Sequence, residues 1–83
     1  MKATHPDKSL MKELLIKTAI SVESARSSQA KTNLLSLCEH GMAIPEHSDL
    51  VQEVLKQTQI KAEADENVRV LQHKEKHKHN SLE

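Results

Sequence analysis

The feature that most constrains the fold is the absence of aromatic side chains, because none of the 83 residues is Phe, Tyr or Trp. Aromatic residues bury the most area per residue and dominate protein cores and binding anchors. The interior must therefore be built from Leu, Ile, Val, Met and Ala, which interdigitate well between packed helices. A β-rich fold would also need frequent turn residues, and the chain has one Gly and two Pro. The sequence predicts a single all-α domain.

The balance of charge limits the classes of partner. Twelve Lys and Arg residues are matched by twelve Asp and Glu residues, which gives a formal net charge of zero with neutral histidines. Proteins that bind nucleic acids or anionic membranes normally carry a basic excess. No apolar run is long enough to span a bilayer, and the N-terminal residues lack the apolar stretch of a secretory signal. With Cys38 as the single cysteine, we expect a cytoplasmic protein without a membrane segment.

Two helical segments of similar length are predicted on either side of the sequence Gly41-Met42-Ala43-Ile44-Pro45. Gly41 stands where a left-handed cap would end the first helix, and Pro45 suits the first position of the second helix. The short connection makes the two helices antiparallel neighbours. The expected boundaries are helices at about 7–40 and 45–75, a turn at 41–44, a hairpin domain of residues 7–76, a disordered N-terminus at 1–6, and a disordered basic, His-rich tail at 77–83.

The apolar pattern of each segment changes direction near its middle. At 100° per residue, the two apolar stripes of one segment point more than a quarter turn apart. These stripes are Met11–Leu15–Val22 and Ala30–Leu34–Leu37 in the first segment, and Val51–Leu55–Ala62 and Ala64–Val68–Leu71 in the second. A hairpin of two straight helices therefore has more apolar surface than it can cover by itself.

Two architectures are compatible with this pattern. In the first, each helix contacts its hairpin partner with one stripe and a second subunit with the other, so that a homodimer completes a four-helix bundle. In the second, the first segment breaks near Ser27-Ser28 and gives a monomeric three-helix bundle. We favour the dimer because Ile16 and Ile20 lie off the first stripe, which makes the early helix apolar on two sides.

This surplus of apolar surface suggests a function in protein–protein contact. We expect a small non-enzymatic regulatory or adaptor protein that self-associates and binds a protein partner, as yet unknown, through a helix face. The residues predicted to form the exposed contact surface are Ile16, Ile20, Val68 and Leu71.

A helical bundle that binds nucleic acid is the alternative function. Its candidate contacts are Arg26, Gln29 and Asn33, which share a polar side of the first segment, together with Lys31. The chain offers no aromatic side chain on which a base could stack.

No catalytic, metal or cofactor site is predicted. Cys38 and His40 lie two residues apart and so point away from each other on a helix, and Cys38 is expected to be a small buried side chain. His73 and His77 are four residues apart, with His79 close by, but the surrounding lysines oppose a divalent cation. Gly-rich phosphate loops and carboxylate pairs placed for acid–base chemistry are also missing from the sequence.

Overall fold

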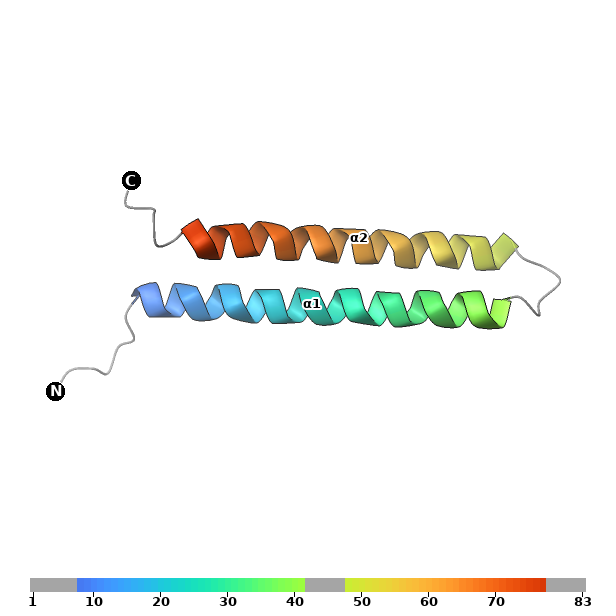
Figure 1. Cartoon of the computed structure of the whole chain (residues 1–83), viewed down its shortest axis with the longest axis horizontal. Coiled ribbons are helices and arrows are strands. Elements are labelled where there is room, and N and C mark those ends of the chain that lie inside the picture. Colours follow the sequence, from blue (N-terminus) through green and yellow to red (C-terminus); the bar gives the residue numbers. More distant parts are fainter. Residues whose placement is uncertain (1–7, 42–47, 78–83) are drawn as a thin grey trace.

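The protein is a helical hairpin in a computed structural model that describes residues 8–41 and 48–77 (Figure 1). Helix α1 comprises Lys8–Gly41 and helix α2 comprises Ser48–His77. The two helices lie side by side and antiparallel, which confirms the predicted all-α hairpin, and no strand occurs in either described range. The second helix is described from Ser48 onwards, and the predicted start at Pro45 lies outside the described residues. The predictions for the turn and for both chain ends fall largely on residues 1–7, 42–47 and 78–83, outside the described part.

Helix α1 continues without a break through Ser27 and Ser28, so the alternative with a third helix is wrong for this fold. The small Ser27 side chain faces α2 and is 8% exposed. Serine lowers helix propensity only modestly, and that cost is offset here by hydrogen bonds to the other helix. Ser27 therefore allows the helices to lie close together, and α1 does not end at Ser27 or Ser28.

The contact between the helices follows one continuous stripe along each of them, which we call the seam. The seam positions recur at alternating steps of three and four residues, the spacing of a left-handed coiled coil. In α1 they are Ile16, Ile20, Glu23, Ser27, Ala30, Leu34, Leu37 and Gly41, and in α2 they are Leu50, Val54, Gln57, Lys61, Ala64, Val68, Leu71 and Glu75. The seam thus keeps one direction from end to end and accepts polar residues in its middle.

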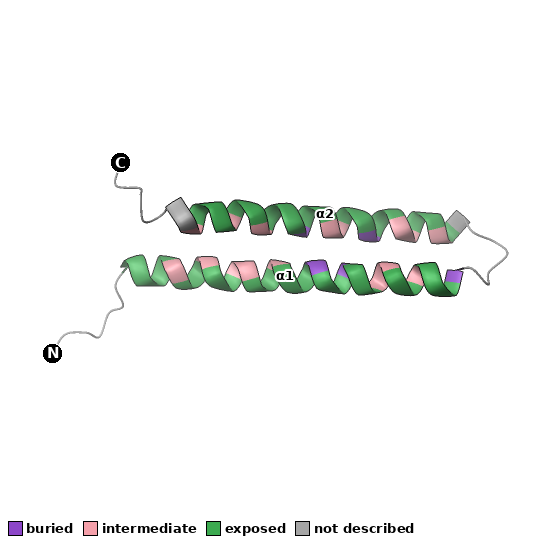
Figure 2. Cartoon of the chain, in the orientation of Figure 1, coloured by how far each residue is buried: buried purple, intermediate pink, exposed green. Residues whose placement is uncertain are grey.

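The seam buries few side chains and little apolar surface. Among the described residues, Ala30 and Ala64 are the buried hydrophobic side chains, at 1% and 0% exposed. No large side chain in the described ranges is fully buried, and Figure 2 shows most of both helices as exposed. A two-helix hairpin has no third element to cover its outer surfaces, so the large apolar residues outside the seam stay in contact with water.

Gly41 has a different role from the one predicted for it. It is the last residue of α1 and does not have a positive φ, so it is not a left-handed cap. Instead, it lies against α2, where a Cβ atom added to it would be 2.8 Å from Leu50 Cδ1. Glycine at this position allows the two helices to approach closely at the turn end of the hairpin.

Neither described helix contains a segment that is both long and apolar enough to cross a membrane.

The close approach at the centre of the seam can be tested by enlarging Ala64. We expect Ala64→Leu to lower the free energy of unfolding by about 1–3 kcal/mol, because a larger side chain pushes the helices apart. The matched control is Ala25→Leu on the exposed side of α1, which should change the stability by less than about 0.5 kcal/mol. Urea unfolding followed by circular dichroism measures both values. A stabilising Ala64→Leu would contradict the close approach.

Candidate interaction surfaces

Large apolar side chains lie on the outside of the hairpin along both helices. Nine of them are between 41% and 63% exposed. They are Leu10, Met11, Leu14, Leu15, Val22 and Leu35 on α1, and Val51, Leu55 and Val70 on α2. Single exposed leucines are common on soluble proteins, but contiguous apolar patches mark interaction sites. The question is therefore whether these side chains gather into patches.

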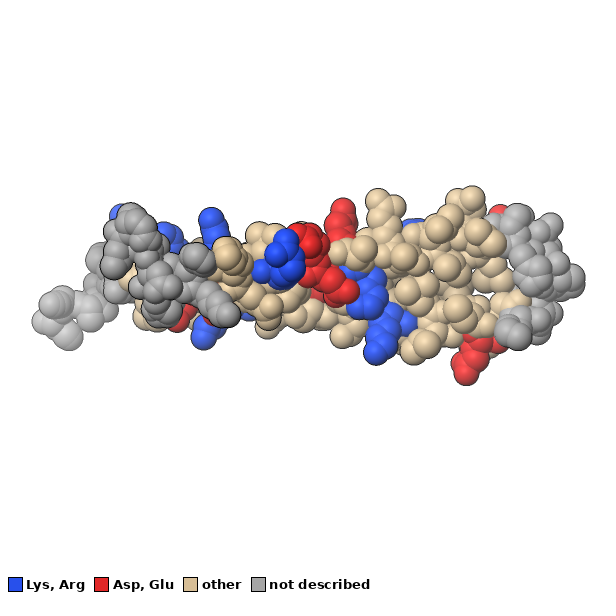
Figure 3. Space-filling view, turned by 45° about the horizontal axis from the view of Figure 1, so that its top comes forward, with Lys and Arg blue, Asp and Glu red and all other residues tan. Residues whose placement is uncertain are grey.

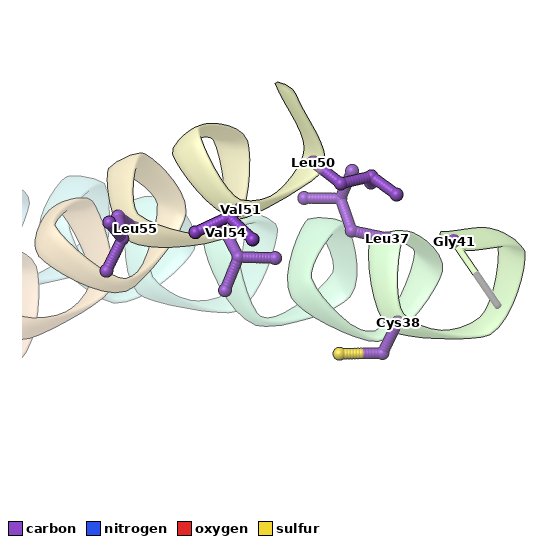
Figure 4. A pocket seen from close by; sticks show the side chains of 7 residues that line it. All are labelled: Leu37, Cys38, Gly41, Leu50, Val51, Val54 and Leu55. Atoms are coloured by element: carbon purple, nitrogen blue, oxygen red, sulfur yellow. The ribbon is translucent and has the colours of Figure 1, made fainter. Parts of the chain in front are cut away.

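The first patch is a groove between the two helices at the turn end, which we call the turn-end groove. Its volume is about 480 Å³. Figure 4 shows the side chains that form it, which are Leu37, Cys38 and Gly41 from α1 and Leu50, Val51, Val54 and Leu55 from α2. Every lining side chain is apolar or a thiol, so water in the groove finds few hydrogen-bond partners and is readily displaced by an apolar ligand.

The second patch is a convex row on α1, which we call the α1 ridge and which consists of Met11, Leu14, Leu15, Thr18 and Val22. With a seam period of 3.5 residues, positions 11 and 18 point directly away from α2, and the others flank them. All five residues are exposed. The ridge therefore protrudes from the hairpin near the N-terminal end of α1, whereas the turn-end groove is hollow and lies at the opposite end.

The structure places the four predicted contact residues elsewhere than expected. Ile16, Ile20, Val68 and Leu71 all lie half-buried along the seam, where the two helices face each other. They are not on an outer surface of the hairpin, because the continuous seam includes both isoleucines. A direct contact of these side chains with a partner stays a prediction, and the exposed apolar surface is formed by other residues.

The sequence pattern already indicated the apolar residues of the turn-end groove and of the α1 ridge. The stripes Met11–Leu15–Val22 and Val51–Leu55–Ala62 are offset from the stripes that the seam uses. That offset shows that each helix has two apolar sides. It does not show which side meets the other helix, because both stripes have helical spacing and similar residue types.

The centre of the hairpin is held by polar contacts between the helices. The Ser27 hydroxyl of α1 donates a hydrogen bond to Asp65 Oδ1 and accepts one from Lys61 Nζ at 3.0 Å. Lys61 Nζ also donates to Asp65 Oδ2 at 2.8 Å. First Lys61 and then Ser27 hold the pKa of the Asp65 carboxyl below its ordinary value of 3.8, because both stabilise the charged form.

A second cross-helix cluster surrounds Glu23. Its Oε1 atom accepts hydrogen bonds from Arg26 Nη1 at 3.1 Å and from Asn67 Nδ2 of α2 at 3.2 Å. Arg26 Nη2 also donates to Glu63 Oε1 of α2 at 3.2 Å. These carboxylates raise the pKa of Arg26 above its ordinary value, first through the bond to Glu23 and then through the bond to Glu63. The guanidinium is thus engaged within the hairpin.

The remaining nucleic-acid candidates are also engaged or are separated in space. Gln29 donates to Asn33 at 3.1 Å, and Asn33 donates in turn to the buried Gln57 of α2 at 3.1 Å. Lys31 follows Ala30 of the seam, whereas Arg26 and Asn33 each precede a seam residue, so Lys31 lies on the other lateral side. The four candidate residues therefore do not form one basic surface.

The charged side chains and the uncharged ones are distributed unevenly along the hairpin. On the face that Figure 3 presents, a broad uncharged surface lies towards the turn end with acidic side chains at its edges, and charged side chains cross the middle and the terminal end. Within the described residues, no group of three or more His, Cys, Asp and Glu side chains is placed to hold a metal ion. The side chains of His77 and His79 lie outside that part of the chain.

Cys38 is exposed, although the sequence suggested a buried position. It directly follows the seam residue Leu37, so its side chain lies at the edge of the contact and lines the turn-end groove. The thiol thus contributes to an open apolar surface.

Comparison with models of protein families, with curated proteins and with solved structures finds no significant match to this chain.

The contact of Ser27 with Asp65 predicts how this carboxyl responds to pH. The pKa of Asp65 is lowered in the folded state, so its contribution to stability is present above pH 3.8 and is lost as the pH falls through the lower, folded value. We expect Ser27→Ala to raise the pKa of Asp65 towards 3.8 without reaching it, since Lys61 remains in place. A carboxyl-detected NMR titration measures the change.

Glu66 provides the internal control for this titration. Its pKa is lowered by a hydrogen bond from Arg69 within α2, whereas the side-chain hydrogen bonds of Ser27 join it to Asp65 and Lys61. The pKa of Glu66 should therefore be unchanged in Ser27→Ala. An unchanged pKa of Asp65 would contradict the cross-helix hydrogen bond.

Proposed function

We propose that this protein is a small non-enzymatic regulatory or adaptor protein that acts through contacts of its helix faces with other proteins, and that a second copy of the chain is one of these partners. The observation that carries the proposal is the turn-end groove together with the α1 ridge. Both are apolar, both are exposed, and neither is covered by the rest of the described chain. Surfaces of this kind are typical of sites where proteins bind one another.

The thin seam supports self-association in particular. Hairpins of two helices gain most of their stability from tertiary packing, and here the fully packed positions are the alanines Ala30 and Ala64. A chain with so small an interior needs further apolar burial to offset its conformational entropy. A second copy of the chain can supply that burial, and it is available wherever the protein is present. The assembly is either a closed dimer that forms a four-helix bundle or a head-to-tail series of hairpins.

Nucleic-acid binding is the weaker of the two proposed functions because of how the cationic side chains are placed. Arg26 is paired with two carboxylates, and the net charge of the chain is zero. Phosphate binding draws on unpaired cationic side chains that release counterions, and of the two cationic candidates Arg26 is paired and Lys31 lies on the other lateral side of α1.

The proposal is tested by the mass of the protein in solution. We expect the wild-type chain to sediment at micromolar concentration as a species heavier than the 9.4 kDa monomer. Leu55→Asp should weaken this association at least about tenfold, because a carboxylate in an apolar contact must lose its hydration. Leu55 is 58% exposed, so its replacement removes little packing within the hairpin itself.

The matched control is Gln59→Asp, which adds the same charge one helical turn further along α2. Gln59 is exposed and lies on the side of α2 away from α1 and outside the turn-end groove. This variant should sediment like the wild type. Wild-type protein that sediments as a monomer over the whole concentration range would overturn the proposed self-association.

A further inference from the structure

We infer that the α1 ridge of one copy binds in the turn-end groove of another, so that the hairpins associate head to tail through two different surfaces. The inference rests on the proposed self-association and specifies its geometry. A convex row of side chains and a hollow are complementary shapes, whereas two hollows facing each other would leave space between them. Among the described residues, the α1 ridge and the turn-end groove lie at opposite ends of the hairpin.

The spacing of the two surfaces matches. The ridge positions Met11, Leu15, Thr18 and Val22 follow one another at steps of four, three and four residues. An exposed row on α2, which we call the α2 stripe, repeats the same steps in Val51, Leu55, Thr58 and Ala62. Each row therefore spans about 16.5 Å at 1.5 Å per residue. The first two residues of the α2 stripe line the turn-end groove, and the last two extend the contact beyond it.

Side-chain sizes favour an antiparallel docking of the ridge on the stripe. In that direction, Met11 meets Ala62 and Leu15 meets Thr58, and the smaller Thr18 meets Leu55 near the groove. The fourth layer pairs Val22 with Val51. Every layer then contains a similar total volume, as close packing requires. In the parallel direction, Leu15 would meet Leu55 while Thr18 met Thr58, so a crowded layer would lie next to a gap.

Charge agrees with the antiparallel docking. Three residues before Met11 stands Lys8, and three residues after Ala62 stands Asp65, so the two residues meet at the end of the same register. Both are exposed. The Asp65 side chain retains 52% of its accessible surface in the presence of Lys61, so a second cation can approach it. This pair selects the register and adds little affinity, because exposed ion pairs are weak.

The ridge and the groove lie on different sides of the hairpin, and this decides the type of assembly. Antiparallel docking of α1 on α2 of the next copy makes the two hairpins point the same way and staggers them along their length, so the contact leaves one free groove and one free ridge on every pair of copies. Further copies add until a ring closes or a chain of hairpins grows. The wild-type assembly is therefore expected to increase in mass with concentration beyond the dimer.

Two complementary variants test this geometry. Leu15→Asp removes the ridge, and Leu55→Asp removes the centre of the α2 stripe, at positions that are 63% and 58% exposed. Each variant alone keeps one of the two surfaces and lacks the complementary one, so each should sediment as a 9.4 kDa monomer. An equimolar mixture joins the intact groove of the first variant to the intact ridge of the second. It should form a one-to-one complex of twice that mass.

The outcomes separate the inference from the proposed function. If wild-type protein associates and Leu15→Asp associates equally well, self-association stands and the head-to-tail contact is overturned in favour of a closed dimer. A mixture that remains monomeric also overturns the contact. Circular dichroism should show less helix in each variant alone than in the equimolar mixture, because association stabilises the folded hairpin. Met11→Asp and Val51→Asp remove the same two surfaces and repeat the test.

Discussion

The seam between α1 and α2 is built on small residues and polar residues at its centre, and the rest of the structure depends on this. Ala30 and Ala64 allow the helices to approach closely, but they bury little apolar area. Because the seam keeps one direction along both helices, the large side chains that do not fit its spacing remain on the outside. The exposed apolar surfaces of the hairpin are thus a direct consequence of how its two helices meet.

The polar contacts at the centre give the hairpin its register. Ser27 binds both Lys61 and Asp65, and Glu23 binds Asn67, so a shift of one helical turn would separate several partners together. Exposed polar contacts contribute little net stability, whereas buried ones that lose their partners are costly. The centre therefore specifies one alignment of the helices while leaving much of the required stability to apolar burial elsewhere. The groove and the ridge are the surfaces on which that burial is available.

The sequence was sufficient to predict the two helices, their antiparallel arrangement and the presence of a second apolar side. Lack of aromatic residues and the single interruption near Gly41 led to this result, and both are local properties of the chain. The choice between the two apolar sides was not predictable, because it depends on how tightly the whole seam packs. Ile16 and Ile20 were expected outside and lie in the seam, while Leu15 and Leu55, assigned to stripes of equal quality, lie outside. The close approach of the two helices at Ala64 depends on tertiary packing, which the helical spacing of apolar residues does not predict.

The central claim is that the hairpin alone buries too little apolar surface and is completed by association with further copies. Association makes thermal stability depend on protein concentration, because mass action favours the assembled, folded state. The most direct measurement is the midpoint temperature of thermal unfolding, monitored by circular dichroism at protein concentrations that span a hundredfold range. Over that range, mass action changes the stability of an associating protein by up to about 2.7 kcal/mol. We expect a midpoint that rises steadily with concentration. A midpoint that stays constant over that range would show that the single hairpin is stable by itself and would contradict the account.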